Sequence, residues 1–267
     1  MKNEITPNSK IPFKIILSTA VYLIAYLLTT VLFTSFNDRL PYGSALIGTF
    51  AFLTAGIAAF LTVTKDERGP LFYNPSAAFA GKKHIIPFII MLILTAYSLT
   101  VVFNYLFTLI PWHVFGSKNI VQNSESFYSI PLYLRLISYV LIGPFAEEVL
   151  FRVVLFSRLR KIIPFIFAAF VSSLLFGLYH GNLMQGLYAF VMGIVICLFM
   201  DEGGSVIYAY AFHMAANLVS NLCYEFKYIN NVVYSIPGIV ICFVYLVVAI
   251  TIYYVFKHRL TKKDKQC

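Results

Sequence analysis

The sequence has few charged residues and few of the motifs that mark soluble enzymes. Only 12% of its 267 residues are charged, 60% are hydrophobic, and the mean hydropathy is +0.81. A soluble domain has about 25% charged and about 45–50% apolar residues. The chain also lacks a CxxC pair, an HExxH helix, internal repeats and an obvious Ser or Cys nucleophile. The low charge and high apolar content exclude a soluble globular fold. Without an HExxH helix, the most specific zinc-protease signal is missing.

Long apolar runs are what the sequence has instead. They are continuous for about 20 residues rather than alternating, which favours membrane-spanning helices and excludes a β-barrel. We therefore expect an all-α polytopic membrane protein that forms one integral-membrane domain over residues 1–267. The predicted spans number about eight and cover residues 14–34, 43–64, 85–110, 131–156, 163–180, 183–200, 205–222 and 235–256.

The basic residues are distributed unequally between the loops. With eight spans, 15 of the 20 Lys and Arg lie on the side of both termini and 3 on the other, while Arg135 and Arg152 fall within spans. This asymmetry predicts a multi-pass protein of the cell membrane with cytoplasmic termini. It also explains the net charge of +9 through topology and contact with the lipid bilayer, so no nucleic-acid partner is expected.

Three polar motifs interrupt the apolar runs at helical spacing. They are Glu147-Glu148-x-x-x-Arg152, Phe176-x-x-x-His180 and His213-x-x-x-Asn217. A charge at the centre of a spanning helix costs about 2.5–3.5 kcal/mol on insertion scales. Because such residues are seldom kept in a membrane without a use, the three motifs are the candidate functional site.

The first motif contains one paired and one unpaired carboxylate. Glu148 and Arg152 are four residues apart and can form an ion pair on one helix face. Glu147 lies about 100° around the helix and is free to face a cavity. Gly143-Pro144 just before the motif should kink or interrupt the helix. The alternative for the Glu148–Arg152 pair is that it only fixes helix packing.

The other two motifs lie on faces that can approach neighbouring helices. Small residues at 173, 177 and 181 form a track beside His180 that permits close helix contact. Ala209, His213, Asn217 and Asn221 form one stripe, which is directed at protein rather than lipid. Taken alone, His180 could be an interfacial residue, and the stripe could serve only interhelical hydrogen bonding.

The depth of these residues in the membrane gives an independent test. If Pro164 begins the fifth span, Glu147 lies 17 residues before it and His180 lies 16 after it. In an antiparallel pair of helices the two then reach nearly the same level. His213 lies nine residues after Gly204, roughly 14 Å from the inner boundary. The three side chains should therefore meet near mid-membrane.

Such a cluster suits hydrolysis of an amide bond. A carboxylate beside an imidazole can hold and deprotonate a water, and a second His with an Asn amide can stabilise an oxyanion. Glu147, His180 and His213 could alternatively bind zinc or another divalent metal with a water in the open position. The residues alone leave both mechanisms open.

The ordered set of EExxxR, FxxxH and HxxxN on three spans resembles the CPBP family of intramembrane proteases, also called Abi, which includes type II CAAX endopeptidases. The resemblance covers about residues 130–222, the expected catalytic core on spans four, five and seven. It implies that Glu147 activates water with His180, and that His213 and Asn217 form the oxyanion site. Glu148, Arg152 and Phe176 complete the motifs. The family names favour a metalloprotease, but a metal-free glutamate mechanism stays open.

The resemblance implies a membrane-associated peptide or protein as substrate, in bacteriocin self-immunity or peptide-signal processing. Prenylated CaaX substrates are not expected. One alternative is a non-catalytic immunity or regulatory partner with the same fold. Another is a transporter with a proton relay, which the confinement of polar residues to spans four to seven disfavours. The sequence gives no oligomeric state.

Overall fold

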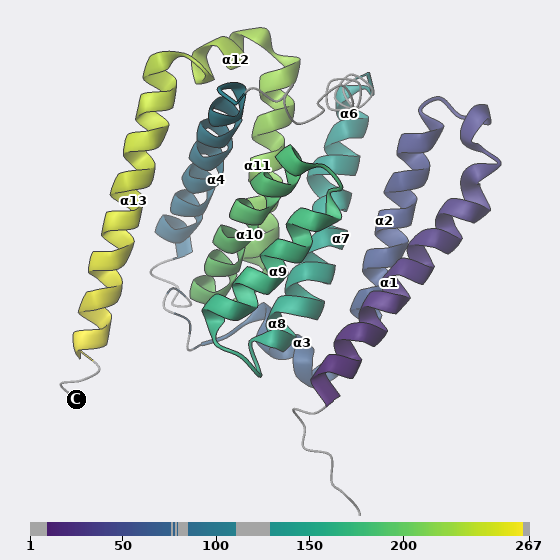
Figure 1. Ribbon diagram of the computed structural model, residues 1–267, viewed down its shortest axis with the longest axis horizontal. Coiled ribbons are helices and arrows are strands. Elements are labelled where there is room, and N and C mark those ends of the chain that lie inside the picture. The colour runs from purple at the N-terminus through teal and green to yellow at the C-terminus, as the bar shows by residue number, and fades with distance from the viewer. Residues whose placement is uncertain (1–9, 76, 78, 80–84, 111–128, 264–267) are drawn as a thin grey trace, which may run out of the picture.

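The chain folds into a bundle of helices. The computed structural model describes residues 10–75, 77, 79, 85–110 and 129–263, with side chains described as far as residue 254. The described part contains helices and no strand, as expected. Its longest helices run roughly side by side, and α1 begins at the same end of the bundle at which α13 finishes (Figure 1).

The eight expected spans each coincide with a helix or a run of helices. These are α1 (Ile11–Thr34), α2 (Gly43–Leu61), α4 (Ile85–Thr108), the run from α6 to α8 (132–159), α9 (Phe165–Tyr179), α10 (Leu183–Gly203), α11 (Val206–Glu225) and α13 (Ile236–Lys263). Two short helices, α3 (Lys65–Phe72) and α12 (Lys227–Val233), connect them. The helix α2 packs on α1, and α4 packs on both α11 and α13.

Five of these helices are long and apolar enough to cross a membrane by themselves: α1, α2, α4, α10 and α13. The helix α9 has only 15 residues, which gives a length of about 22 Å against a hydrocarbon core of about 30 Å. Span five is therefore shorter than the sequence suggested. Its C-terminal end, where His180 lies, falls within the bundle. The total of eight crossings stays a prediction.

The fourth predicted span switches between α and π geometry four times. It passes through α6 (Leu132–Arg135), π-helical η5 (Leu136–Ile142), α7 (Gly143–Glu148), π-helical η6 (Val149–Phe156) and α8 (Ser157–Leu159). The Gly143 N–H bonds to the carbonyl of Ser138, five residues back. The expected interruption at Gly143-Pro144 is thus a switch from π to α geometry. Such π segments are frequent at functional sites.

Backbone contact between α9 and α10 confirms most of the expected small-residue track. A Cβ added to Gly177 would lie 2.6 Å from the carbonyl oxygen of Gly186, and one on Gly193 would lie 2.9 Å from Ser173. Only glycine permits this approach. Gly181 differs from the expectation, because nothing lies within 4 Å of its Cβ position and its φ is +70°. It forms the turn between the two helices instead.

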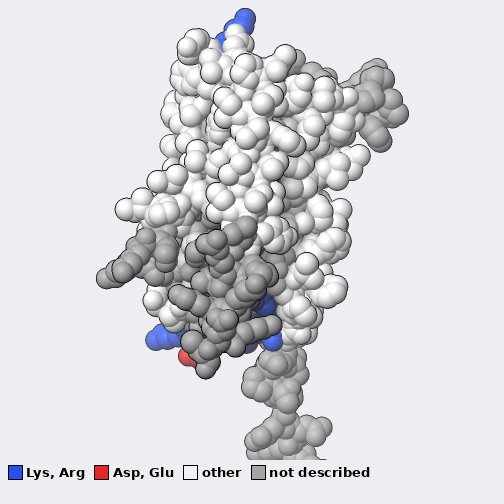
Figure 2. Space-filling view, turned by 90° about the vertical axis from the view of Figure 1, so that its left-hand side faces the viewer, with Lys and Arg blue, Asp and Glu red and all other residues white. Residues whose placement is uncertain are grey.

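Charged side chains gather at the ends of the bundle. On the face shown in Figure 2, the Lys, Arg and acidic residues drawn in colour lie at the two ends, and the long middle part shows none. At the end where α1 begins, the Glu67 carboxylate lies 3.2 Å from Nζ of Lys14, 3.3 Å from Nη2 of Arg158 and 3.6 Å from Nζ of Lys161. This cluster joins α1, α3 and α8.

Candidate active site

Two neighbouring glutamates at the end of α7 face different surroundings. Glu148 is 2% exposed, whereas Glu147 lines a cavity of about 390 Å³. Glu148 Oε2 lies 3.2 Å from Nε of Arg152, which confirms the expected ion pair. The Arg152 guanidinium also lies over the ring of Phe176, 4.6 Å from its centroid. A buried charge is thereby paired and packed rather than left alone.

His213 connects the two glutamates from the opposite helix, α11. Its Nδ1 lies 2.7 Å from Oε1 of Glu148, and its Nε2 lies 3.5 Å from Oε2 of Glu147. A turn at Gly204 with φ of +70° and the Ser205 N-cap fix the start of α11. Glu148 therefore does more than pair with Arg152, because it also sets the orientation of the His213 ring.

The ring protons of His213 follow from these contacts. A carboxylate only accepts hydrogen bonds, so Nδ1 carries the hydrogen that is donated to Glu148. The Nε2 atom then donates towards the cavity only when the ring carries hydrogens on both nitrogens. In that state the cationic His213 and Arg152 balance the anionic Glu147 and Glu148, which limits the cost of burying all four.

His180 lies at the C-terminal end of α9 and lines the same cavity. Its Nδ1 lies 2.9 Å from the carbonyl oxygen of Phe176, which only accepts, so Nδ1 carries the ring hydrogen. With its one hydrogen on Nδ1, a neutral His180 ring would present the lone pair of Nε2. The Phe176 ring packs edge-on against both histidines, with centroids 4.9 Å from His180 and 5.5 Å from His213.

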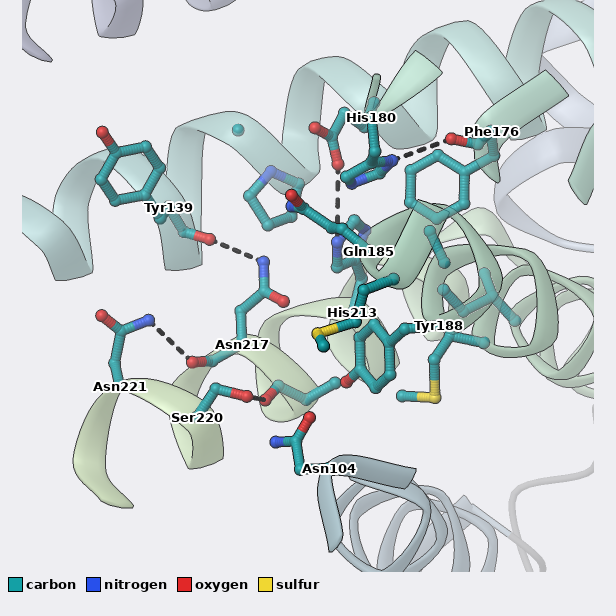
Figure 3. Close-up of a pocket in the computed structure, with 18 of the residues that line it drawn as sticks. Asn104, Tyr139, Phe176, His180, Gln185, Tyr188, His213, Asn217, Ser220 and Asn221 are labelled. Atoms are coloured by element: carbon teal, nitrogen blue, oxygen red, sulfur yellow. Dashed lines mark hydrogen bonds and ion pairs between the residues drawn. The ribbon is translucent and has the colours of Figure 1, made fainter. Parts of the chain in front are cut away.

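Asn217 lies one helical turn beyond His213 and also lines the cavity. Its Nδ2 donates to the carbonyl oxygen of Tyr139 at 2.8 Å (Figure 3). This bond uses one of the two hydrogens of the amide, so the donation to an oxyanion that the sequence suggested stays a prediction. Farther along the stripe, Asn221 donates to the carbonyl of Asn217 at 2.9 Å. The stripe therefore faces protein, as expected, and part of it serves interhelical bonding.

The cavity brings together the four residues predicted to be catalytic. Glu147, His180, His213 and Asn217 all contribute to its wall. Other elements contribute neutral polar and aromatic side chains, of which Asn104, Gln185 and Tyr188 are labelled in Figure 3. A carboxylate, an imidazole lone pair and a second imidazole around one cavity can hold and activate a water.

Comparisons with known proteins agree with this arrangement. Residues 129–219 match a model described as type II CAAX prenyl endopeptidase Rce1-like. Over these residues, about a third of its length, the chain is similar to the CAAX protease family. The matched segment contains all three motifs and nearly coincides with the expected core at 130–222.

Two curated proteins are similar to parts of this chain. The membrane-embedded CAAX protease MroQ of Staphylococcus aureus USA300 is 29% identical over 127 residues, which covers 44% of this chain and 49% of MroQ. The putative membrane peptidase YdiL of Bacillus subtilis 168 is 31% identical over 86 residues, 32% of this chain and 35% of YdiL. The chain thus spans about half or less of these relatives. No solved structure gives a significant match.

CAAX proteases raise the question of a metal, because the family names favour metalloproteases. In the parts of the chain that the structure describes, no three His, Cys, Asp or Glu side chains form a set that could hold an ion. Nε2 of His180 and Nε2 of His213 offer donor atoms. However, Glu147, His180 and His213 do not form such a set in this arrangement. The residues therefore do not fit a three-ligand metal site as they stand.

Sequence reasoning missed several parts of the candidate active site. Neither the Glu148–His213 bond nor the role of Tyr139 as a backbone acceptor was expected, and Asn182 and Gln185 were not singled out. A signal for the last two was present, because Asn followed three residues later by Gln is typical of a helix N-terminus. It correctly marks the first turn of α10, whose N-cap is Asn182.

Proposed function

We propose that this protein is an intramembrane endopeptidase that hydrolyses a peptide bond of a membrane-associated peptide or protein. The observation that carries the proposal is the contact between Glu147 and His213, whose Oε2 and Nε2 atoms lie 3.5 Å apart at a cavity wall. The CAAX protease match supports it, because the family is one of peptidases.

Glu147 is the proposed general base. A water held between its carboxylate and the Nε2 lone pair of His180 gives one hydrogen to Glu147 as its oxygen attacks the carbonyl carbon. The carbonyl π electrons move to oxygen and form a tetrahedral oxyanion. When the C–N bond breaks, Glu147 returns the proton to the leaving amine, so atoms and charge balance without a covalent enzyme intermediate.

His213 is the proposed oxyanion donor. With hydrogens on both ring nitrogens, it donates from Nε2 to the developing oxyanion while Glu148 holds Nδ1. Removing one such donor in other enzymes costs about 10²–10³-fold in rate. Asn217 lies beside this donor in the wall of the cavity.

The direct test compares cleavage of membrane-associated peptides by the wild type and by Glu147→Gln in detergent or liposomes. Equal rates would remove Glu147 from the mechanism. In cells, the Glu147→Ala, His213→Ala double variant should lose the protein's effect on bacteriocin resistance or on a processed signal peptide, the roles we propose. Full retention of that effect would instead support a non-catalytic immunity or regulatory partner.

A further inference from the structure

The side-chain amide of Gln185 is held in one orientation at the wall of the cavity. Gln185 lies in the first turn of α10, is exposed and points into the cavity (Figure 3). Its backbone N–H donates to Oδ1 of Asn182 at 2.8 Å. Nδ2 of Asn182 in turn donates to Oε1 of Gln185 at 3.0 Å. One asparagine therefore both caps the helix and holds the glutamine side chain.

The backbone N–H of Gln185 determines which terminal atoms of Asn182 and Gln185 are oxygen and which are nitrogen. A backbone N–H can only donate, so the Asn182 atom that faces it must be oxygen. The other terminal atom of Asn182 is then its NH₂ group, and the Gln185 atom that it meets must be an acceptor. The remaining terminal atom of Gln185 is Nε2, an NH₂ donor with no hydrogen-bond partner among the described residues.

Asn217 offers the complementary atom by the same logic. Its Nδ2 donates one hydrogen to the carbonyl of Tyr139, which identifies the other terminal atom as Oδ1, an acceptor on a residue of the cavity wall. The wall thus presents an oriented donor from α10 and an oriented acceptor from α11. A peptide backbone carries the matching pair of groups, a C=O and an N–H.

We infer that Gln185 is a substrate-binding residue, whose Nε2 donates to a backbone carbonyl of an extended peptide while Oδ1 of Asn217 accepts from a backbone N–H. This inference rests on the proposed function. The segment is bound in extended form because a helix uses its own carbonyls and N–H groups internally. Gln185 acts beside the reacting atoms, in holding the substrate, rather than on the oxyanion.

The composition of the cavity wall identifies the class of side chains in the bound segment. Glu147 is the one Asp, Glu, Lys or Arg among the described residues of the wall, and the rest are apolar, aromatic, amide, hydroxyl or imidazole side chains. A charged substrate side chain would lose its water there without a partner. The bound segment should therefore consist of uncharged residues, recognised largely through its backbone.

The first test replaces the donor and keeps the shape. Gln185→Met removes both amide atoms but preserves the length of the side chain and the Asn182 cap on the backbone N–H. For cleavage of a fluorescein-labelled peptide of leucine, alanine and serine, we expect kcat/KM to fall roughly tenfold through KM, with kcat nearly unchanged. A decrease in kcat with KM unchanged, or an unchanged kcat/KM, would overturn the inference.

The second test reverses the orientation of the Gln185 side-chain amide by changing Asn182 instead of Gln185. Asn182→Asp keeps an acceptor for the backbone N–H and remains a good N-cap. Its second oxygen now faces Gln185, which turns the NH₂ group towards Asp and the carbonyl towards the cavity. We expect the same rise in KM, and no further rise in the double variant with Gln185→Met. Asn230→Asp adds an equal charge away from the cavity and should leave KM unchanged.

Binding measured without turnover separates this inference from the proposed function. In the Glu147→Gln background, anisotropy of the labelled peptide should show affinity about tenfold weaker when Gln185→Met is added. Weaker binding without any wild-type cleavage would support the Gln185 contact and reject the peptidase. If cleavage depends on Glu147 but neither peptide binding nor KM changes with Gln185→Met, the contact between Gln185 and the substrate is rejected. The proposed peptidase activity would then be supported.

Discussion

His213 Nδ1 is bonded to Glu148, at 2.7 Å, whereas its Nε2 faces Glu147, at 3.5 Å. The two adjacent glutamates thus have separate tasks, because one orients the imidazole and the other lies at the cavity. The ion pair of Glu148 with Arg152 therefore contributes to the site as well as to packing, since one carboxylate contacts both the Arg152 guanidinium and the His213 ring.

Glu148→Gln should therefore reduce both stability and activity. Gln keeps an oxygen for His213 but leaves Arg152 as a buried charge without its carboxylate. We expect a loss of about 3–5 kcal/mol in the free energy of unfolding, measured by thermal or denaturant unfolding in detergent. Arg152→Met combined with Glu148→Gln should recover much of the stability and none of the cleavage. Recovery of cleavage would show that Glu148 serves packing alone.

Gly177→Ala should destabilise the pair formed by α9 and α10. The added methyl would lie 2.6 Å from the carbonyl oxygen of Gly186, so the helices must separate. We expect a loss of about 1–3 kcal/mol, as for overpacked cores. Gly48→Ala is the control, because no atom lies within 4 Å of its Cβ position and alanine favours a helix. Equal melting temperatures of the two variants would contradict the close approach.

The Glu67 cluster should make stability depend on acid pH. Burial acts to raise the pKa of Glu67, but the bond from Thr64 and the cations of Arg158 and Lys14 outweigh it and lower the pKa to about 2. Because the pKa of Glu67 is lower in the folded than in the unfolded protein, its ionised carboxylate stabilises the fold at pH values above the unfolded-state pKa of about 4.3. That contribution is lost as the pH falls from there towards 2.

Glu67→Gln should melt at a lower temperature than the wild type at pH 7. The difference should narrow as the pH falls below about 4.3, because the wild-type carboxylate is then losing its charge. Melting curves of both proteins across this range provide the measurement. A difference that stays constant with pH would mean that the carboxylate's charge does not stabilise the contact between α1, α3 and α8.

Metal removal should leave cleavage intact. Glu147, His180 and His213 form no three-ligand set in the described structure, so the proposed water activation uses the carboxylate and the imidazole lone pair. We expect protein treated with a chelator and then desalted to retain its single-turnover rate. The opposite result is a chelated protein that loses this rate and regains it when one zinc ion binds per chain. That result would contradict water activation by Glu147 and His180 without a metal.

The positions of Glu147 and His180 along the helix axes could be predicted from the sequence, whereas the hydrogen bonds of the site could not. Helical rise and the position of Pro164 suffice to bring Glu147 and His180 to one depth, and both line the cavity. The Glu148–Arg152 pair follows from spacing on one helix. These relationships are local or depend only on regular geometry.

Contacts between helices depend on rotation and packing that a single sequence does not reveal. Glu148 meets His213 because α7 and α11 face each other at that rotation, and the π-helical segments on either side of α7 change the phase of the run. The Asn182–Gln185 contact is local, but its importance comes from the cavity beside it. For the same reason, the donor of Asn217 could be assigned to Tyr139 only from the structure.

The role of Glu147 as general base is tested most directly by the single-turnover rate of peptide cleavage by Glu147→Gln relative to the wild type. We predict a rate about 10²–10⁴-fold lower with peptide binding preserved. Glu202→Gln, a change of the same kind outside the cavity, should cleave at the wild-type rate, because the Gln oxygen can still accept from the Tyr253 hydroxyl. Wild-type cleavage by Glu147→Gln would contradict the assignment of Glu147 as the base that activates water.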